Sequence, residues 1–180
     1  QELWKDLSNA LPNKGHLFFK HLYDEGKLAG LITQNIDGLH EKSGLPKEII
    51  VNLHGTNLEV TCLDCGFTVP SQDVFDRLDL EQGVPLCPEC NGFFKPNTIS
   101  FGQQLRGEDL SRANDLAVSC DLMIVVGSTL VVQPASSIPS IAKEKGALLS
   151  IITLSETPLD SYADFVFHLK VDDFITIFQS

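Results

Sequence analysis

Apolar and polar positions along the chain follow two different spacings, and the way they alternate predicts an α/β fold. Leu17, Phe18 and Leu22 recur at helical spacing after a capping Asn13, and Gly26 ends the run. Helices are also predicted at 107–119, 134–145 and 172–178, and strands at 29–33, 49–53, 122–126, 148–154 and 165–169, with a short strand end at 99–101. Strands that alternate with helices predict a doubly wound parallel sheet. The nearly unbroken apolar run 122–126 predicts a strand covered on both faces.

Residues 58–95 interrupt this pattern and predict a small inserted module. They contain two C-x-x-C pairs, a helix candidate at 71–80 and several turn residues. The pairs are Cys62 with Cys65 and Cys87 with Cys90, separated by 21 residues. Four thiolates in this arrangement predict one tetrahedral zinc, which is structural because no coordination position stays open. Two disulfides or a redox pair are the alternatives. Residues 1–57 and 96–180 then form the remaining domain.

Three polar clusters follow predicted strands, and ligands of parallel sheets bind at the carboxyl ends of strands. The clusters are 34–37 (QNID), His54 with Gly55, and 127–129 (GST). Together they predict an active site, with His54 as a candidate general base because imidazole titrates near neutrality. A histidine in this place is also compatible with a purely structural role.

The other two clusters also have alternative interpretations that involve no ligand. Asn35 and Asp37 suit recognition of a sugar or a carboxamide, but both types of residue often cap a turn or a short helix. Backbone N–H groups and hydroxyls of Gly127, Ser128 and Thr129 suit a phosphate or a ribose, although a single glycine turn is weak evidence.

Composition narrows the classes of partner. The 180 residues, 43% of them hydrophobic, suffice for one sizeable core, and no apolar run is long enough to span a bilayer. A net charge of −11 disfavours direct nucleic-acid binding and favours lysine-rich peptides, although acidity also simply aids solubility. Cysteine pairs without a secretory signal indicate a reducing intracellular compartment, taken as cytoplasmic with the nucleus left open.

Taken in order, these motifs resemble the sirtuin family. The similar segments are 33–40 (TQNIDGLH), 53–55 (LHG), the two C-x-x-C pairs, 95–96 (KP), 99–102 (ISFG) and 127–135 (GSTLVVQPA). The resemblance implies a Rossmann-like NAD-binding domain with a small zinc-ribbon module. It also implies NAD-dependent deacylation of an acylated lysine peptide or protein: the acyl oxygen attacks C1′ of the nicotinamide ribose, nicotinamide leaves, and the acyl group ends on ADP-ribose.

The resemblance also implies roles for individual residues. His54 is the general base, acting on a ribose hydroxyl. NAD contacts are implied for Gln34, Asn35, Asp37, Gly127, Ser128, Thr129, Thr153, Leu154 and Val171. An apolar tunnel and added-strand pairing for the substrate are implied for Ile99, Phe101, Gly102 and Val132.

The chain departs from the family pattern at three places. No glycine-rich turn with an arginine-bearing loop precedes Gln34, so we expect residues 1–180 alone to bind NAD very weakly. Gln103 stands where many members have glutamate, and Thr153 where an asparagine often contacts the adenine ribose. ADP-ribosyl transfer or NAD hydrolysis, and a non-catalytic zinc-bearing interaction module, are therefore the rival functions.

Overall fold

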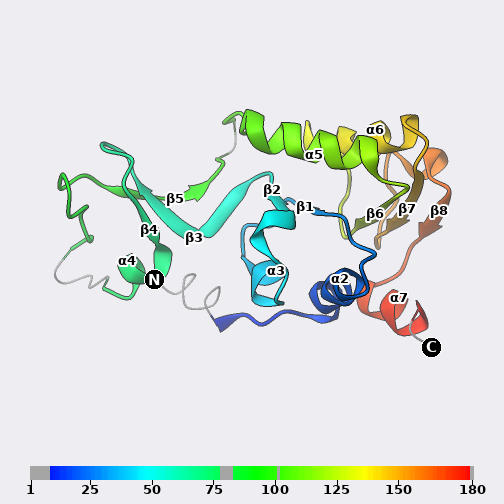
Figure 1. Ribbon diagram of the computed structural model, residues 1–180, viewed down its shortest axis with the longest axis horizontal. Coiled ribbons are helices and arrows are strands. Elements are labelled where there is room, and N and C mark those ends of the chain that lie inside the picture. The colour runs from blue at the N-terminus through cyan, green and yellow to red at the C-terminus, as the bar shows by residue number, and fades with distance from the viewer. Residues whose placement is uncertain (1–8, 78–82, 101, 179–180) are drawn as a thin grey trace.

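The computed structural model describes residues 9–77, 83–100 and 102–178, and its strands form three sheets along the molecule's long axis (Figure 1). An antiparallel sheet of order β4-β3-β5 lies at one end, the parallel pair β1-β2 in the middle and a parallel sheet β6-β7-β8 at the other end. The strands are β1 (Leu31–Thr33), β2 (Ile50–Asn52), β3 (Gly55–Cys62), β4 (Thr68–Pro70), β5 (Phe94–Thr98), β6 (Leu122–Val126), β7 (Leu148–Ile152) and β8 (Phe165–Phe167).

Helices surround the parallel strands, as the sequence predicts. They are α2 (Lys14–Asp24), α3 (Leu39–Lys42), α5 (Gly107–Ser119), α6 (Ile138–Glu144) and α7 (Val171–Phe178), whereas α4 (Ser71–Phe75) packs on the antiparallel strands β3 and β4. Short 3-10 turns lie at Lys47–Ile49, Ala135–Ser137 and Asp160–Tyr162. The helix predicted at 134–145 therefore begins as a 3-10 turn. The helix predicted at 71–80 is α-helical only to Phe75, and 78–80 lie outside the described residues.

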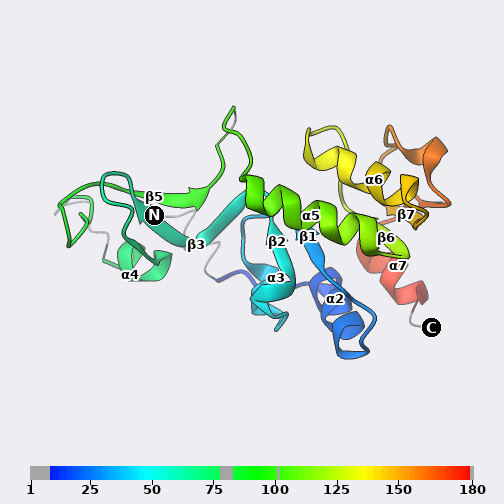
Figure 2. The same cartoon turned by 45° about the horizontal axis from the view of Figure 1, so that its top comes forward.

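Helices α5 and α6 form a layer over the parallel strands, which the tilted view makes clear (Figure 2). Ala113 and Ala117 of α5 and Ala142 of α6 are fully buried, and such small side chains let the two helices approach closely. Val51 and Leu53 belong to the same core cluster. The core thus fixes the strand β2 that leads to His54.

Strand β6 corrects the expectation of a strand covered on both faces. Met123 and Val125 pack into apolar clusters on one face, but Leu122 on the other face is 43% exposed. Its registered partner Leu148 is 48% exposed. Within the described residues β6 pairs with β7 alone, and β1 pairs with β2 alone, so the parallel strands form two sheets there.

The antiparallel sheet is the feature that the sequence analysis missed. Strand β3 pairs with both β4 and β5, and its register with β5 shifts between Thr56 and Val60. The strand end expected at 99–101 falls after β5, which closes at Thr98, and Phe101 lies outside the described residues. The irregular register bends β3 toward the parallel strands, as bulges do beside functional sites.

None of the helices in the described ranges is long and apolar enough to cross a membrane.

Gly55 is the tightest backbone position between β3 and the rest of the fold. Its φ is +74°, and a Cβ at this position would lie 2.1 Å from the carbonyl oxygen of Asn97. We expect Gly55→Ala to lower the free energy of unfolding by roughly 3 kcal/mol, because backbone strain and the clash with β5 add together. Urea denaturation measures this loss.

Gly26→Ala is the matched control. Gly26 has a φ of +69°, but a Cβ there would meet nothing within 4 Å. Its expected loss is therefore only the cost of the left-handed backbone, about 1–2 kcal/mol. Equal losses in the two variants would show that β5 moves aside freely and that the contact between Gly55 and Asn97 is unimportant.

Candidate functional site

The ends of β1 and β2 meet, and their meeting brings His54 to Gln34. The parallel ladder continues one residue past β2, because the Leu53 N–H donates to the Thr33 carbonyl at 3.0 Å. One residue further on, His54 Nδ1 lies 3.1 Å from the Gln34 carbonyl oxygen. A carbonyl oxygen only accepts, so Nδ1 carries the proton and Nε2 keeps its lone pair. His54 is half-buried, and its Nε2 atom is thus suited to accept a proton.

The loop 34–38 is held in place from the side of β3. Asn57, in the irregular part of β3, donates its N–H to the Ile36 carbonyl at 2.8 Å. The next residue, Leu58, packs directly over Gly38, where an added Cβ would come within 2.6 Å of its side chain. Gly38 has a φ of +69°, so this turn needs glycine for both space and backbone conformation.

Within the loop, Asp37 closes a turn with its side chain. Its Oδ1 accepts the Leu39 N–H at 3.0 Å, while the N-cap residue of α3 is Gly38, which makes no side-chain cap. Asn35 is exposed, and its N–H donates to Thr33 Oγ1 at 3.0 Å, which leaves its side-chain amide toward the surface. A turn that is fixed by Asp37 and presents Asn35 can offer an amide and a carboxylate to the same ligand.

The cluster after β6 is joined to the cluster after β1. Gln34 Nε2 donates to Ser128 Oγ at 3.4 Å, and Ser128 Oγ also accepts the Leu130 N–H at 3.3 Å. Gly127 has a φ of +65° and donates its N–H to the Ile152 carbonyl at the end of β7. Gln34, His54 and Ser128 therefore lie at one edge, the carboxyl ends of the parallel strands.

The remaining predicted residues occupy several segments. Thr153 is buried at the end of β7 and Leu154 beside it is exposed, while Val171 begins α7. The structure brings one of the predicted substrate residues to the histidine, since the Ile99 N–H donates to the His54 carbonyl at 2.9 Å. Gly102 and Val132 are exposed, and the predicted contact at Phe101 lies outside the described residues.

Sequence reasoning overlooked the residues that support the loop. Asn57 and Leu58 reach it only because β3 has an irregular register, and His40 packs behind it against His16. Periodicity carried no signal for these contacts. The one signal in the sequence that could have led to His40 is that a histidine closely follows the polar cluster 34–37.

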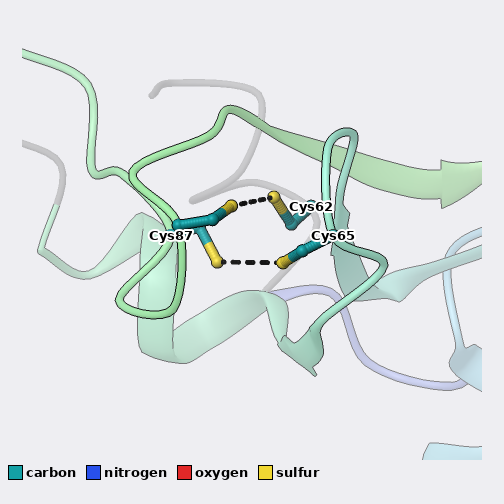
Figure 3. Close-up of side chains that lie close together, drawn as sticks. Cys62, Cys65 and Cys87 are labelled. Carbon is teal, nitrogen blue, oxygen red and sulfur yellow. Dashed lines mark hydrogen bonds between the residues drawn. The ribbon is translucent and has the colours of Figure 1, made fainter.

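The four cysteines converge on one point in the antiparallel module (Figure 3). Their sulfur atoms all lie within 4.8 Å of one another, with Cys62 Sγ 3.5 Å from Cys90 Sγ and Cys65 Sγ 3.6 Å from Cys87 Sγ. Zinc–sulfur bonds of about 2.3 Å in a tetrahedron place sulfur atoms ~3.8 Å apart. All five cysteines of the chain are free thiols, so the geometry fits a single zinc ion held by four sulfurs.

The electrostatics of the cluster also favour a cation. A backbone hydrogen bond from Cys65 lowers the pKa of the Cys62 thiol to about 7. A hydrogen bond from Gly92 favours the Cys90 thiolate too, but the Cys65 and Cys62 side chains outweigh it and raise the pKa of Cys90 to about 12. Thiols this close cannot all ionise near neutrality unless a divalent ion compensates their charge.

Comparison with known proteins bears on most of the chain. The sequence model of the Sir2 family matches residues 2–134. The NAD-dependent protein deacetylase 1 of Bradyrhizobium diazoefficiens is 43% identical over 157 residues, which are 87% of this chain and 61% of that protein. The NAD-dependent protein deacetylase of Thermotoga maritima is 38% identical over 165 residues, which are 92% of this chain and 66% of that protein.

Solved structures agree. A structure described as Sir2 with a p53 peptide and NAD+ has a TM-score of 0.87 at 37% identity, over 95% of this chain and 70% of the other. Sir2Tm bound to a propionylated peptide has a TM-score of 0.88 at 37% identity, over 95% of this chain and 71% of the other. The chain belongs to the Sir2 family, and it spans under two thirds of the length of the relatives from Bradyrhizobium and Thermotoga.

Metal content tests the cysteine cluster. We expect one zinc per purified chain, and we expect removal of zinc by a chelator to lower the unfolding temperature, because a closed site contributes to folding. Cys87→Ser should reduce the zinc content measured by elemental analysis. Cys120→Ala is the control, since Cys120 Sγ donates to the Ala117 carbonyl, away from the cluster. Absence of metal together with a Cys62–Cys65 disulfide under reducing conditions would contradict the assignment.

Proposed function

We propose that this chain carries the catalytic centre of an NAD-dependent protein-lysine deacylase, in which the acyl group passes to ADP-ribose and nicotinamide is released. The observation that carries the proposal is the hydrogen bond between His54 Nδ1 and the Gln34 carbonyl, which leaves Nε2 as a free proton acceptor at the carboxyl ends of the parallel strands. The names of the relatives, NAD-dependent protein deacetylases, support it.

The residues around His54 divide into those for NAD and those for the peptide. NAD supplies a ribose carbon from which nicotinamide departs, and His54 Nε2 takes a proton from a ribose hydroxyl. Gln34, Asn35 and Asp37 contact the nicotinamide ribose side. The ribose-phosphate and adenosine parts of NAD are contacted by Gly127, Ser128, Thr129, Thr153, Leu154 and Val171.

The acylated lysine enters beside His54. Ile99, which hydrogen-bonds to the His54 backbone, lines its path together with Phe101, Gly102 and Val132, and exposed backbone there pairs with the peptide as an added strand. The net charge of −11 attracts lysine-rich segments. Residues 58–95 hold the structural zinc, and residues 1–57 with 96–180 bind NAD.

The proposed role of His54 can be tested by substitution in the protein that carries this chain. His54→Ala should reduce deacylation by about 10²–10⁴-fold, because it removes the general base, while the peptide still binds. Nicotinamide release with an acetylated peptide gives the rate, and fluorescence anisotropy of a labelled peptide gives the affinity.

His21→Ala serves as the control. His21 is exposed on α2, where its Nε2 lies 3.1 Å from Glu25 Oε1, so this variant should keep the full rate. Near-normal turnover in His54→Ala would exclude the base role. Nicotinamide release that does not depend on the acetylated peptide would instead favour NAD hydrolysis over deacylation.

A further inference from the structure

A pair of buried histidines lies directly behind the loop 34–38. His16 of α2 and His40 of α3 have ring centroids 4.6 Å apart with planes tilted by 54°. Their exposed fractions are 8% and 9%. The Phe19 ring packs edge-on against His40 at 6.0 Å. The pair therefore connects α2 to α3, the short helix that follows the Asp37 turn.

The two histidines are held differently, His16 through its ring and His40 through its backbone. His16 Nδ1 lies 3.2 Å from the Asn13 backbone nitrogen and 2.7 Å from Asn13 Oδ1, and Asn13 Oδ1 accepts the His16 N–H at 3.2 Å, so the ring is part of the cap of α2. Ser43 Oγ donates to the His40 carbonyl at 2.7 Å. Among the described residues, His40 Nδ1 is buried and has no hydrogen-bond partner.

The environment of the pair favours two neutral rings. Burial and, to a smaller extent, the neighbouring His16 lower the pKa of His40 to about 4, although the carboxylates of Asp37 and Glu41 act in the opposite direction. Burial likewise lowers the pKa of His16 against the influence of Asp37. Lys20, the cation on the adjoining turn of α2, is paired with Asp24, at 2.5 Å.

We propose that His16 and His40 are positioning residues: the neutral, packed pair holds α3 against α2 and keeps the Asp37 turn in the conformation used by the proposed NAD site, and acid releases that turn. The link to NAD rests on the proposed function, but the effect on the turn does not. A proton on His40 places a charge in a buried contact 4.6 Å from a second imidazole. The carboxylate with the larger compensating influence is Asp37, whose Oδ1 is already the acceptor for the Leu39 N–H.

The direction of the pH effect follows from the pKa values. In the unfolded chain His40 titrates near 6.5, and in the fold near 4. The stabilisation by the neutral pair is therefore complete above pH 6.5 and is lost progressively as the pH falls toward 4. His40 alone should raise the unfolding equilibrium constant by about 10–30-fold between pH 7.5 and pH 5.

The experiment compares the chain with His40→Phe and His21→Phe. Phenylalanine keeps the ring packing against His16 and Phe19 but does not titrate, so His40→Phe should lose the 10–30-fold contribution of His40 to the pH dependence of urea unfolding and keep only the part that comes from His16 and other groups. His21→Phe changes an exposed histidine of α2 and should retain the whole pH dependence. Equal pH dependence in the chain and in His40→Phe would overturn the proposal.

A second measurement reports on the conformation of the Asp37 turn. In ¹⁵N-labelled chain, the Leu39 amide resonance should move with the titration of the His40 ring, and this movement should be absent in His40→Phe. If that variant does not fold, the ring ¹³C shifts of the unsubstituted chain can be followed against pH to measure the pKa of His40. A pKa at or above 6.5 contradicts the proposal. Failure of NAD to bind at pH 7.5 to the protein that carries this chain would count against the proposed function alone, because the Leu39 readout needs no NAD.

Discussion

The candidate site depends on one rung of a very short parallel ladder, the hydrogen bond from the Leu53 N–H to the Thr33 carbonyl. This bond sets the register in which the next residues, Gln34 and His54, face each other. Strands of three residues are weak by themselves, so the ladder needs support from outside. Arg112 of α5 supplies part of it by donating to the Glu48 and Ile50 carbonyls at 2.8 and 3.3 Å, and Leu31, Leu45 and Ile50 form a buried cluster beside it.

Much of this arrangement could be read from the sequence, because the relevant signals are local. An apolar run that stops at a polar or glycine residue marks the end of a strand, and parallel strands end at a common edge, so Gln34, His54 and Ser128 were predicted to gather there. The two C-x-x-C pairs likewise predict their own convergence, since ligand spacing within each knuckle is set by a tight turn.

The rest depends on contacts between distant segments, which no local pattern encodes. The shifted register between Thr56 and Val60 places Asn57 and Leu58 on the loop 34–38, and a plain alternation rule cannot anticipate such a shift. The apolar run 122–126 predicts burial on both faces, but apolar composition does not determine which neighbouring elements cover a strand. His40 was not singled out because its importance comes from His16, which lies on another helix.

Strand β3 runs without a break from the residue after His54 to the first zinc ligand, and β5 returns along it as far as Thr98. The two strands cross both ends of the 58–95 segment, and Asn57 and Leu58 lie at one of those ends. A chimera that exchanged 58–95 between relatives would therefore join two strands cut through their hydrogen-bonded middle. A graft that preserves the pairing of β3 with β5 must carry both strands whole, from Gly55 to Thr98. It also needs a loop 34–38 that matches Asn57 and Leu58.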